Sequence, residues 1–181
     1  MPVAKEEKYP AAKRFDIADV QLSREATAVK PKVVANLIKK AKRPLLVTGG
    51  MLLKDEKLVE FAVKFAEKGI PIVATAGSSK PLMERGIKPV AKTFTLHQVT
   101  QFLLDSEFQG FDGKGSYDVV AFLGFTPYYL SRILSALKHF SNITTVAIEE
   151  FYQPHAKFSF TNLMKDKELY YSMLQEVIDS L

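Results

Sequence analysis

Short apolar runs alternate with longer amphipathic segments along most of the chain. Residues 45–48 and 70–75 are apolar without polar alternation, which is typical of strands covered on both faces. Between them, residues 55–68 place four apolar side chains on one helical face, and Gly69 follows as a stop. These four are Leu58, Phe61, Ala62 and Phe65. The pattern predicts two buried parallel strands joined by one helix.

The same alternation extends to the end of the sequence. In the first amphipathic segment, an apolar stripe begins two residues after Pro31. Its members are Val33, Val34, Leu37, Ile38 and Ala41. A later segment opens with Thr95 and Gln98 at the spacing of a capping box. The spacing predicts helices at 31–42, 95–104, 128–140 and 166–181, and strands at 117–123 and 144–148.

Strands that alternate with helices in this way predict an α/β fold. We expect one doubly wound, mainly parallel sheet with helices on both faces. This domain should span residues 30–181, after an extended N-terminal arm at 1–29 that shows little periodicity. A long connection is expected at 78–92, and an irregular stretch at 149–162.

Composition narrows the chemistry. The 181 residues include no cysteine, which excludes disulfides, thiolate zinc sites, thiol catalysis and cysteine-ligated iron–sulfur clusters. Three scattered histidines give no reason to expect a metal site. No apolar run approaches the length of a membrane span, and the first residues lack the apolar segment of a secretory signal. We therefore expect a cytoplasmic chain that binds neither metal nor membrane.

Positive charge is concentrated around the first predicted helix. The net charge is +5, and much of the excess comes from Lys30, Lys32, Lys39, Lys40, Lys42 and Arg43. Such a run can follow the phosphates of a nucleic acid, but a solvated helix face is the simpler interpretation, because no RNA-binding signature accompanies it. We expect no nucleic-acid partner.

A ligand site is predicted where the parallel strands end, because crevices form at that edge in open α/β sheets. Small or hydroxyl-bearing residues gather there, and Phe125 could meet a flavin ring. The dinucleotide fingerprint is missing, since the pair Gly49-Gly50 lacks a third glycine and no acidic residue ends the second strand. The glycines could instead only permit tight strand exits. The candidate cofactor residues are Gly49, Gly50, Gly77, Ser78, Ser79, Gly124, Phe125 and Thr126.

No catalytic arrangement can be identified, and we expect no catalytic residue. The sequence pattern indicates no serine–histidine–acid arrangement, carboxylate pair or Walker loop. His97 falls in a helical first turn, where a neutral, hydrogen-bonded ring is expected, and His139 should face solvent. The pair Glu149-Glu150 follows the fourth strand, where the simplest expectation is a solvated strand end.

Four large rings lie near turns and a helix start: Phe108, Phe111, Tyr128 and Tyr129. Such residues either cover the core or anchor another protein chain, because aromatic side chains dominate protein–protein contacts. We take them as candidate residues of a partner interface, with the core interpretation left open.

Several stretches resemble the epsilon-subunit family of archaeal acetyl-CoA decarbonylase/synthase. They are AKRPLLVTGG, GIPIVATAGSS, TLHQ, FQGFDGKGSYDVVAFLG, PYYLSRILSALKHFSN and SFTNL, collinear over residues 41–163. RPLLVTGG also resembles the Rossmann-like middle domain of thiamine-diphosphate enzymes, some of which hold FAD.

The resemblance implies a non-catalytic accessory subunit. Such a chain would bind and stabilise the alpha subunit, which carries the nickel–iron–sulfur carbon monoxide dehydrogenase chemistry, in an alpha-two, epsilon-two component. The alternative is an electron-transfer subunit that binds FAD in the cleft at the strand ends. Self-association of the chain is left open.

Overall fold

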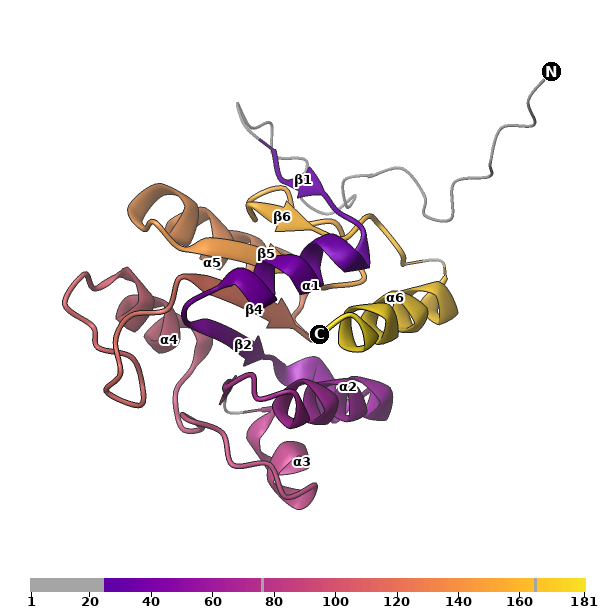
Figure 1. Ribbon diagram of the computed structural model, residues 1–181, viewed down its shortest axis with the longest axis horizontal. Helices are drawn as coiled ribbons and strands as arrows, with labels where there is room; N and C mark the ends of the chain where they lie inside the picture. The colour runs from indigo at the N-terminus through magenta and orange to yellow at the C-terminus, as the bar shows by residue number, and fades with distance from the viewer. Residues whose placement is uncertain (1–24, 76, 165) are drawn as a thin grey trace.

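The computed structural model describes residues 25–75, 77–164 and 166–181. Within them, six strands form one parallel sheet in the order β1-β6-β5-β4-β2-β3 (Figure 1). The expected α/β class and parallel sheet are confirmed. The strands are β1 (Thr27–Ala28), β2 (Pro44–Thr48), β3 (Ile72–Ala74), β4 (Val119–Leu123), β5 (Thr144–Ala147) and β6 (Phe158–Ser159).

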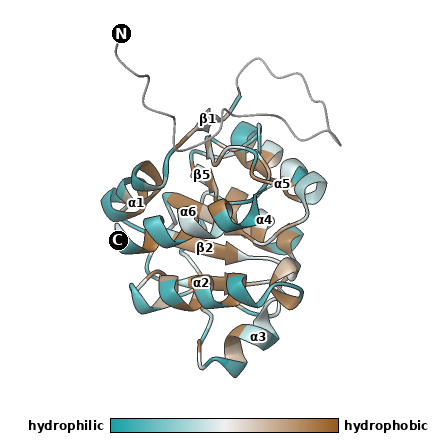
Figure 2. Ribbon diagram, turned by 90° about the vertical axis from the view of Figure 1, so that its right-hand side faces the viewer, coloured by the Kyte–Doolittle hydropathy of each residue, from teal (hydrophilic) through white to brown (hydrophobic). Residues whose placement is uncertain are grey.

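Helices cover both faces of the sheet, so the core has two layers. On one face, apolar side chains of α1 (Pro31–Lys40), α2 (Glu56–Glu67) and α6 (Lys167–Asp179) pack against alternate residues of the central strands. On the other, α4 (Leu96–Leu104) and α5 (Pro127–Phe140) cover the remaining strand residues. The hydropathy colouring shows the strand β2 brown between partly teal helices, as expected of a sheet buried on both faces (Figure 2).

Local sequence explains several helix boundaries. The capping box of α4 is confirmed: the Gln98 N–H donates to Thr95 Oγ1, and the Thr95 N–H donates to Gln98 Oε1 at 2.9 Å. Asp166 caps α6 by accepting the Leu169 N–H at 2.9 Å. Gly69 follows α2 with a φ of 81°, which an L side chain rarely adopts.

Three details of local structure differ from the expectations. Val33 was expected to be buried but is exposed. The buried face of α1 carries Val34, Ala35 and Ile38. Val33 lies about 100° around the helix axis from Val34, outside that face. The connection at 78–92 contains the helix α3 (Ser79–Glu84), whose proline lies in the first turn, where a missing N–H is tolerated. The stretch expected to be irregular through 162 contains β6, which is too short to show a period.

The expected N-terminal arm lies mostly outside the described residues, since its positions 1–24 are not among them. The described end of that segment belongs to the sheet. Strand β1 pairs in parallel with β6, with Thr27 opposite Phe158, and the Tyr152 hydroxyl donates to the Ala26 carbonyl at 2.6 Å. This segment therefore completes one edge of the sheet.

Candidate functional site

The topology places a switch point between β2 and β4. From β2 the chain crosses over to β3 on one side, whereas β4 leads to β5 on the other. In open α/β sheets, ligands bind beside the carboxyl ends of the strands at such a point. The candidate cofactor residues lie at this carboxyl edge. Its geometry therefore bears on whether they can bind a ligand or only allow close packing of the loops.

Two glycines bring the loops after β2 and β4 into direct contact. The Gly49 N–H donates to the Leu123 carbonyl, and the Met51 N–H donates to the Gly124 carbonyl, both at 2.9 Å. A Cβ at Gly49 would lie 2.4 Å from the Gly124 oxygen. Gly124 has a φ of 82°, and a Cβ there would lie 2.4 Å from the Leu52 side chain. These glycines therefore serve close packing within the chain.

Phe125 and Glu149 fill the space above the switch point. The Phe125 ring lies over Gly49 and packs edge-on against Phe122, with ring centroids 6.2 Å apart. The Phe125 N–H donates to Glu149 Oε1 at 3.0 Å. The expectation that Glu149 is a solvated strand end was wrong: its side chain is only 4% exposed, because it turns under the loop that follows β4.

Burial sets the protonation state of Glu149. Loss of solvation raises the pKa of Glu149 to about 8, although the N–H groups of Phe125 and Gly124 favour the charged form. The carboxyl group is therefore mainly neutral at pH 7. A proton held at the carboxyl edge is a feature that the local sequence pattern did not indicate.

Hydroxyl groups tie the ends of β2 and β3 together. Ser78 is fully buried, and its Oγ lies 2.9 Å from Thr48 Oγ1 and 3.0 Å from the Thr48 carbonyl oxygen. Thr75 donates its hydroxyl to the same carbonyl at 2.8 Å. Gly77 lies against Gly50, with 3.2 Å from a Cβ position at Gly77 to the Gly50 Cα. Ser78 is thus a cross-link between strand ends.

The remaining cofactor candidates lie at the starts of helices or are exposed to solvent. Ser79 begins α3, and Thr126 precedes α5 without a side-chain capping bond. Gly50 is exposed, and a Cβ there would meet nothing within 4 Å. The N–H groups of Gly49, Ser78 and Phe125 are bonded within the chain, so in this arrangement these three do not face an FAD pyrophosphate. FAD binding at this edge stays a prediction.

Phe108 and Phe111 belong to a cluster of rings before β4. Phe108 and Phe111 are half-buried, with centroids 4.9 Å apart, and Phe102 lies 5.3 Å from Phe108. Phe94 and Tyr117 extend the cluster at 6.0 and 6.2 Å from Phe111. These rings cover the core of the second layer and leave part of their surface accessible.

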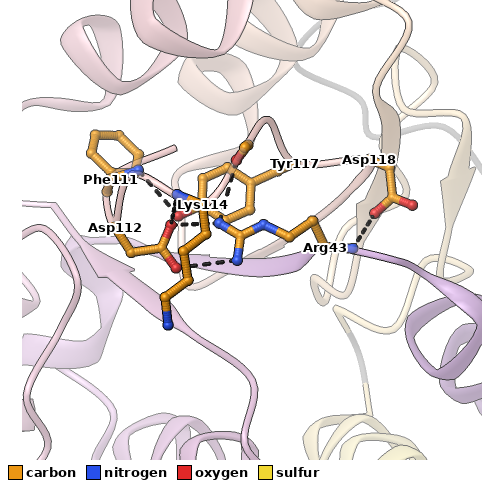
Figure 3. A network of polar contacts seen from close by, with 7 residues as sticks. Arg43, Phe111, Asp112, Lys114, Tyr117 and Asp118 are labelled. Carbon is orange, nitrogen blue, oxygen red and sulfur yellow. Dashed lines mark hydrogen bonds and ion pairs between the residues drawn. The ribbon is translucent and has the colours of Figure 1, made fainter. Parts of the chain in front are cut away.

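Arg43 holds the loop that carries these rings. Its guanidinium donates to both carboxylate oxygens of Asp112, by Nη1 at 3.1 Å and by Nη2, and lies 5.0 Å from the Tyr117 ring centroid (Figure 3). The Arg43 backbone N–H donates to Asp118 at 2.9 Å. The hydrogen bond from Arg43 is the main reason why the pKa of Asp112 lies below its usual value.

Tyr128 and Tyr129 lie at the opposite edge from these rings. Both follow β4 at the start of α5, whereas Phe108 and Phe111 precede β4. Tyr128 is 57% exposed, while Tyr129 is half-buried with its hydroxyl 2.9 Å from His97 Nδ1. The expected hydrogen bond of His97 is confirmed. The four candidate interface residues therefore form two surfaces, one at each edge.

Asp55 joins α2 to α6 through contacts that sequence reasoning missed. The Tyr171 hydroxyl and Lys167 Nζ donate to Asp55 Oδ2 at 2.7 and 2.9 Å. Burial alone would raise the pKa of Asp55, but these hydrogen bonds outweigh it and hold that pKa below its usual value. Asp55 and Tyr171 are 116 positions apart, so no local pattern could have paired them.

Metal ligands and membrane-spanning helices are not found among the described residues. Residues 25–75, 77–164 and 166–181 contain no group of three or more His, Cys, Asp or Glu side chains placed to hold a metal. None of the helices formed by these residues has the length and hydropathy needed to cross a membrane.

The fold and its carboxyl edge define a doubly wound, Rossmann-like α/β domain whose switch point is packed by its own side chains. The chain belongs to the family described as CO dehydrogenase beta subunit/acetyl-CoA synthase epsilon subunit, whose sequence profile matches residues 4–178. The resemblance noted from its motifs is thereby confirmed.

Named relatives agree with the family. Over 181 residues, the chain is 84% identical to acetyl-CoA decarbonylase/synthase complex subunit epsilon 1 of Archaeoglobus fulgidus, covering all of this chain and 98% of the relative. It is 42% identical over 154 residues to the subunit epsilon 1 of Methanosarcina barkeri, covering 84% of this chain and 88% of that protein. The Methanothrix soehngenii subunit epsilon is 37% identical over 168 residues, which are 92% of this chain and 90% of the relative.

Proposed function

We propose that this chain is a non-catalytic accessory subunit of the carbon monoxide dehydrogenase component of acetyl-CoA decarbonylase/synthase. It binds and stabilises the nickel–iron–sulfur alpha subunit in an alpha-two, epsilon-two component, in the cytoplasm. The observation that carries this proposal is the family match over residues 4–178, together with relatives named as epsilon subunits of that complex.

The packing of the carboxyl edge supports a binding role. The switch point, where a substrate would be expected, is filled by Phe125 and Glu149, and the facing loops touch through Gly49 and Gly124. Ring surface remains accessible at Tyr128 and, in part, at Phe108. Such rings are the residue types that anchor protein contacts.

An anaerobic binding measurement with the purified alpha component tests this proposal. The tagged chain should bind it stoichiometrically, and Tyr128→Ala should weaken the binding about tenfold, the effect of losing an aromatic anchor. Leu53→Ala is the control, because Leu53 is also exposed but lies before α2 rather than in α5. Carbon monoxide oxidation by the alpha component after heating should persist longer with the chain than without it. Absence of binding would refute the accessory role.

The FAD alternative is tested separately. Equilibrium dialysis with micromolar FAD should show no uptake by the free chain, because the N–H groups of Gly49 and Phe125 are already bonded. Uptake that Gly50→Val abolishes would support the flavin role instead, since Gly50 is exposed at the predicted cleft.

A further inference from the structure

The amino edge of the sheet carries a groove formed by two adjoining pockets. One, of about 510 Å³, lies between α1 and the starts of β4 and β5, and Val33 and Leu37 line it. The other, of about 380 Å³, lies between the ends of α4 and α5, and Phe108 and Phe140 line it. Both pockets include Asp118 and Asn142, so they form one surface, here called the amino-edge furrow.

Apolar surface in the furrow is exposed on both sides. Val33 is 42% exposed and Phe140 is 76% exposed, although each belongs to a helix that packs other apolar residues into the core. Exposing the apolar ring of a phenylalanine to water is unfavourable in free energy. These two side chains are therefore placed to bury apolar area against another molecule.

Two carboxylates line the furrow, Asp105 and Asp118, and both accept backbone N–H groups, Asp105 that of Glu107 at 2.9 Å. Asp118 accepts the backbone N–H groups of Lys42 and Arg43 at 2.8 and 2.9 Å. The clamp from Arg43 to Asp112 fixes the loop that bears Phe108 (Figure 3). A preformed wall lowers the entropy lost on binding.

The rim beside α1 is positively charged. Lys32, Lys39, Lys40 and Lys42 are exposed, and none of the four makes an ion pair with a carboxylate among the described residues. Lys40 lines the furrow itself, and each of the others is next in sequence to a residue that lines it. These four lysines are most of the basic residues that the sequence concentrates around α1.

We propose that the amino-edge furrow docks an acidic segment of a partner protein, with an apolar side chain between Val33 and Phe140 and carboxylates against the α1 lysines. The apolar walls favour a protein over a nucleic acid, whose phosphates would use the lysines but not Val33. The identity of the partner as the alpha component rests on the proposed function.

Binding of the purified alpha component, measured anaerobically over a range of salt concentrations, tests this assignment. Val33→Asp and the double variant Lys32→Glu/Lys40→Glu should each weaken binding at least about tenfold. Their matched controls are Leu53→Asp and the double variant Lys54→Glu/Lys88→Glu, which change exposed residues elsewhere and should stay within about twofold of wild type. The effect of the lysine changes should shrink at high salt, whereas the part of the Val33→Asp effect that comes from lost apolar contact should persist. Circular dichroism confirms that each variant folds.

The outcomes separate this assignment from the proposed function. No binding by wild type overturns both. If wild type binds and every variant binds with the same affinity, only the docking assignment is overturned. Sedimentation equilibrium that shows self-association lost in Val33→Asp would assign the furrow to a second copy. Retention of a labelled single-stranded oligonucleotide, lost in the lysine variant and kept in Val33→Asp, would assign it to nucleic acid, and either result overturns a protein partner of the stated kind.

Discussion

Replacing Glu149 by glutamine should change how stability depends on pH. Glutamine keeps an oxygen that can accept the Phe125 N–H, so the loop contact at 3.0 Å can persist. It removes the ionisable group, whose pKa burial raises from 4.5 to about 8. The substitution therefore isolates the free energy needed to ionise a carboxyl group beneath the loop after β4.

The direction follows from proton binding. Between pH 4.5 and about 8, the folded state holds the Glu149 proton that the unfolded chain has released, so wild-type stability falls as pH rises through this window. Each pH unit inside the window lowers the free energy of unfolding by about 1.4 kcal/mol. The slope is shallower near each pKa, where one of the two states is itself titrating. The free energy of unfolding of wild type should therefore fall by about 3 kcal/mol between pH 5 and 7.5. Glu149→Gln should not show this fall.

Urea denaturation at several pH values measures this difference. The gap between Glu149→Gln and wild type should widen steadily from pH 5 and level off above about 8. Glu60→Gln, on the exposed side of α2, removes the same charge and should follow the wild-type curve. Groups such as His155, whose pKa burial lowers, titrate in all three proteins and cancel. Parallel curves for wild type and Glu149→Gln would refute a buried, protonated Glu149.

Two further changes test local packing. Gly49→Ala should lower the free energy of unfolding by about 2–4 kcal/mol, because its Cβ would lie 2.4 Å from the carbonyl oxygen of the facing loop. Gly50→Ala, with open space at its Cβ, should change that free energy by less than about 0.5 kcal/mol, and equal effects in urea denaturation would contradict the close packing. Asp112→Asn weakens the clamp, so trypsin should cut at Lys114 faster than in wild type. Asp179→Asn, at the far end of α6, should leave the cleavage rate unchanged, and a rate unaffected by Asp112→Asn would contradict the clamp.

Periodicity explains which parts of the fold could be predicted. The central strands and the long helices each span enough residues to show a period, and their burial follows it. Strand β6 has two residues and its pairing depends on β1 and β5, so no local pattern marks it. Val33 shows a different limit: an apolar residue next to a buried stripe looks the same in sequence whether a neighbouring helix covers it or not.

The candidate site was harder to predict because its properties arise from distant contacts. Gly49 and Gly124 were correctly placed at one edge, but only the folded loops show that each leaves room for the other's loop. The burial of Glu149 depends on Phe125, which lies 24 positions earlier in the chain. A strand-end carboxylate is normally solvated, so its local sequence pointed to the wrong environment.

The two edges of the sheet offer different chemistry to a binding molecule. At the carboxyl edge, Glu149 accepts the N–H groups of Gly124 and Phe125, the donors that an anion would need, so a ligand would have to displace a buried side chain first. At the amino edge, Val33 and Phe140 are exposed beside a wall that Arg43 already holds in place. A partner that binds there buries apolar area without rearranging the fold, whereas opening the carboxyl edge breaks contacts between the central loops. Docking at the amino edge, like contact with the exposed Tyr128 ring, therefore leaves the fold unchanged, whereas a ligand at the switch point must open it.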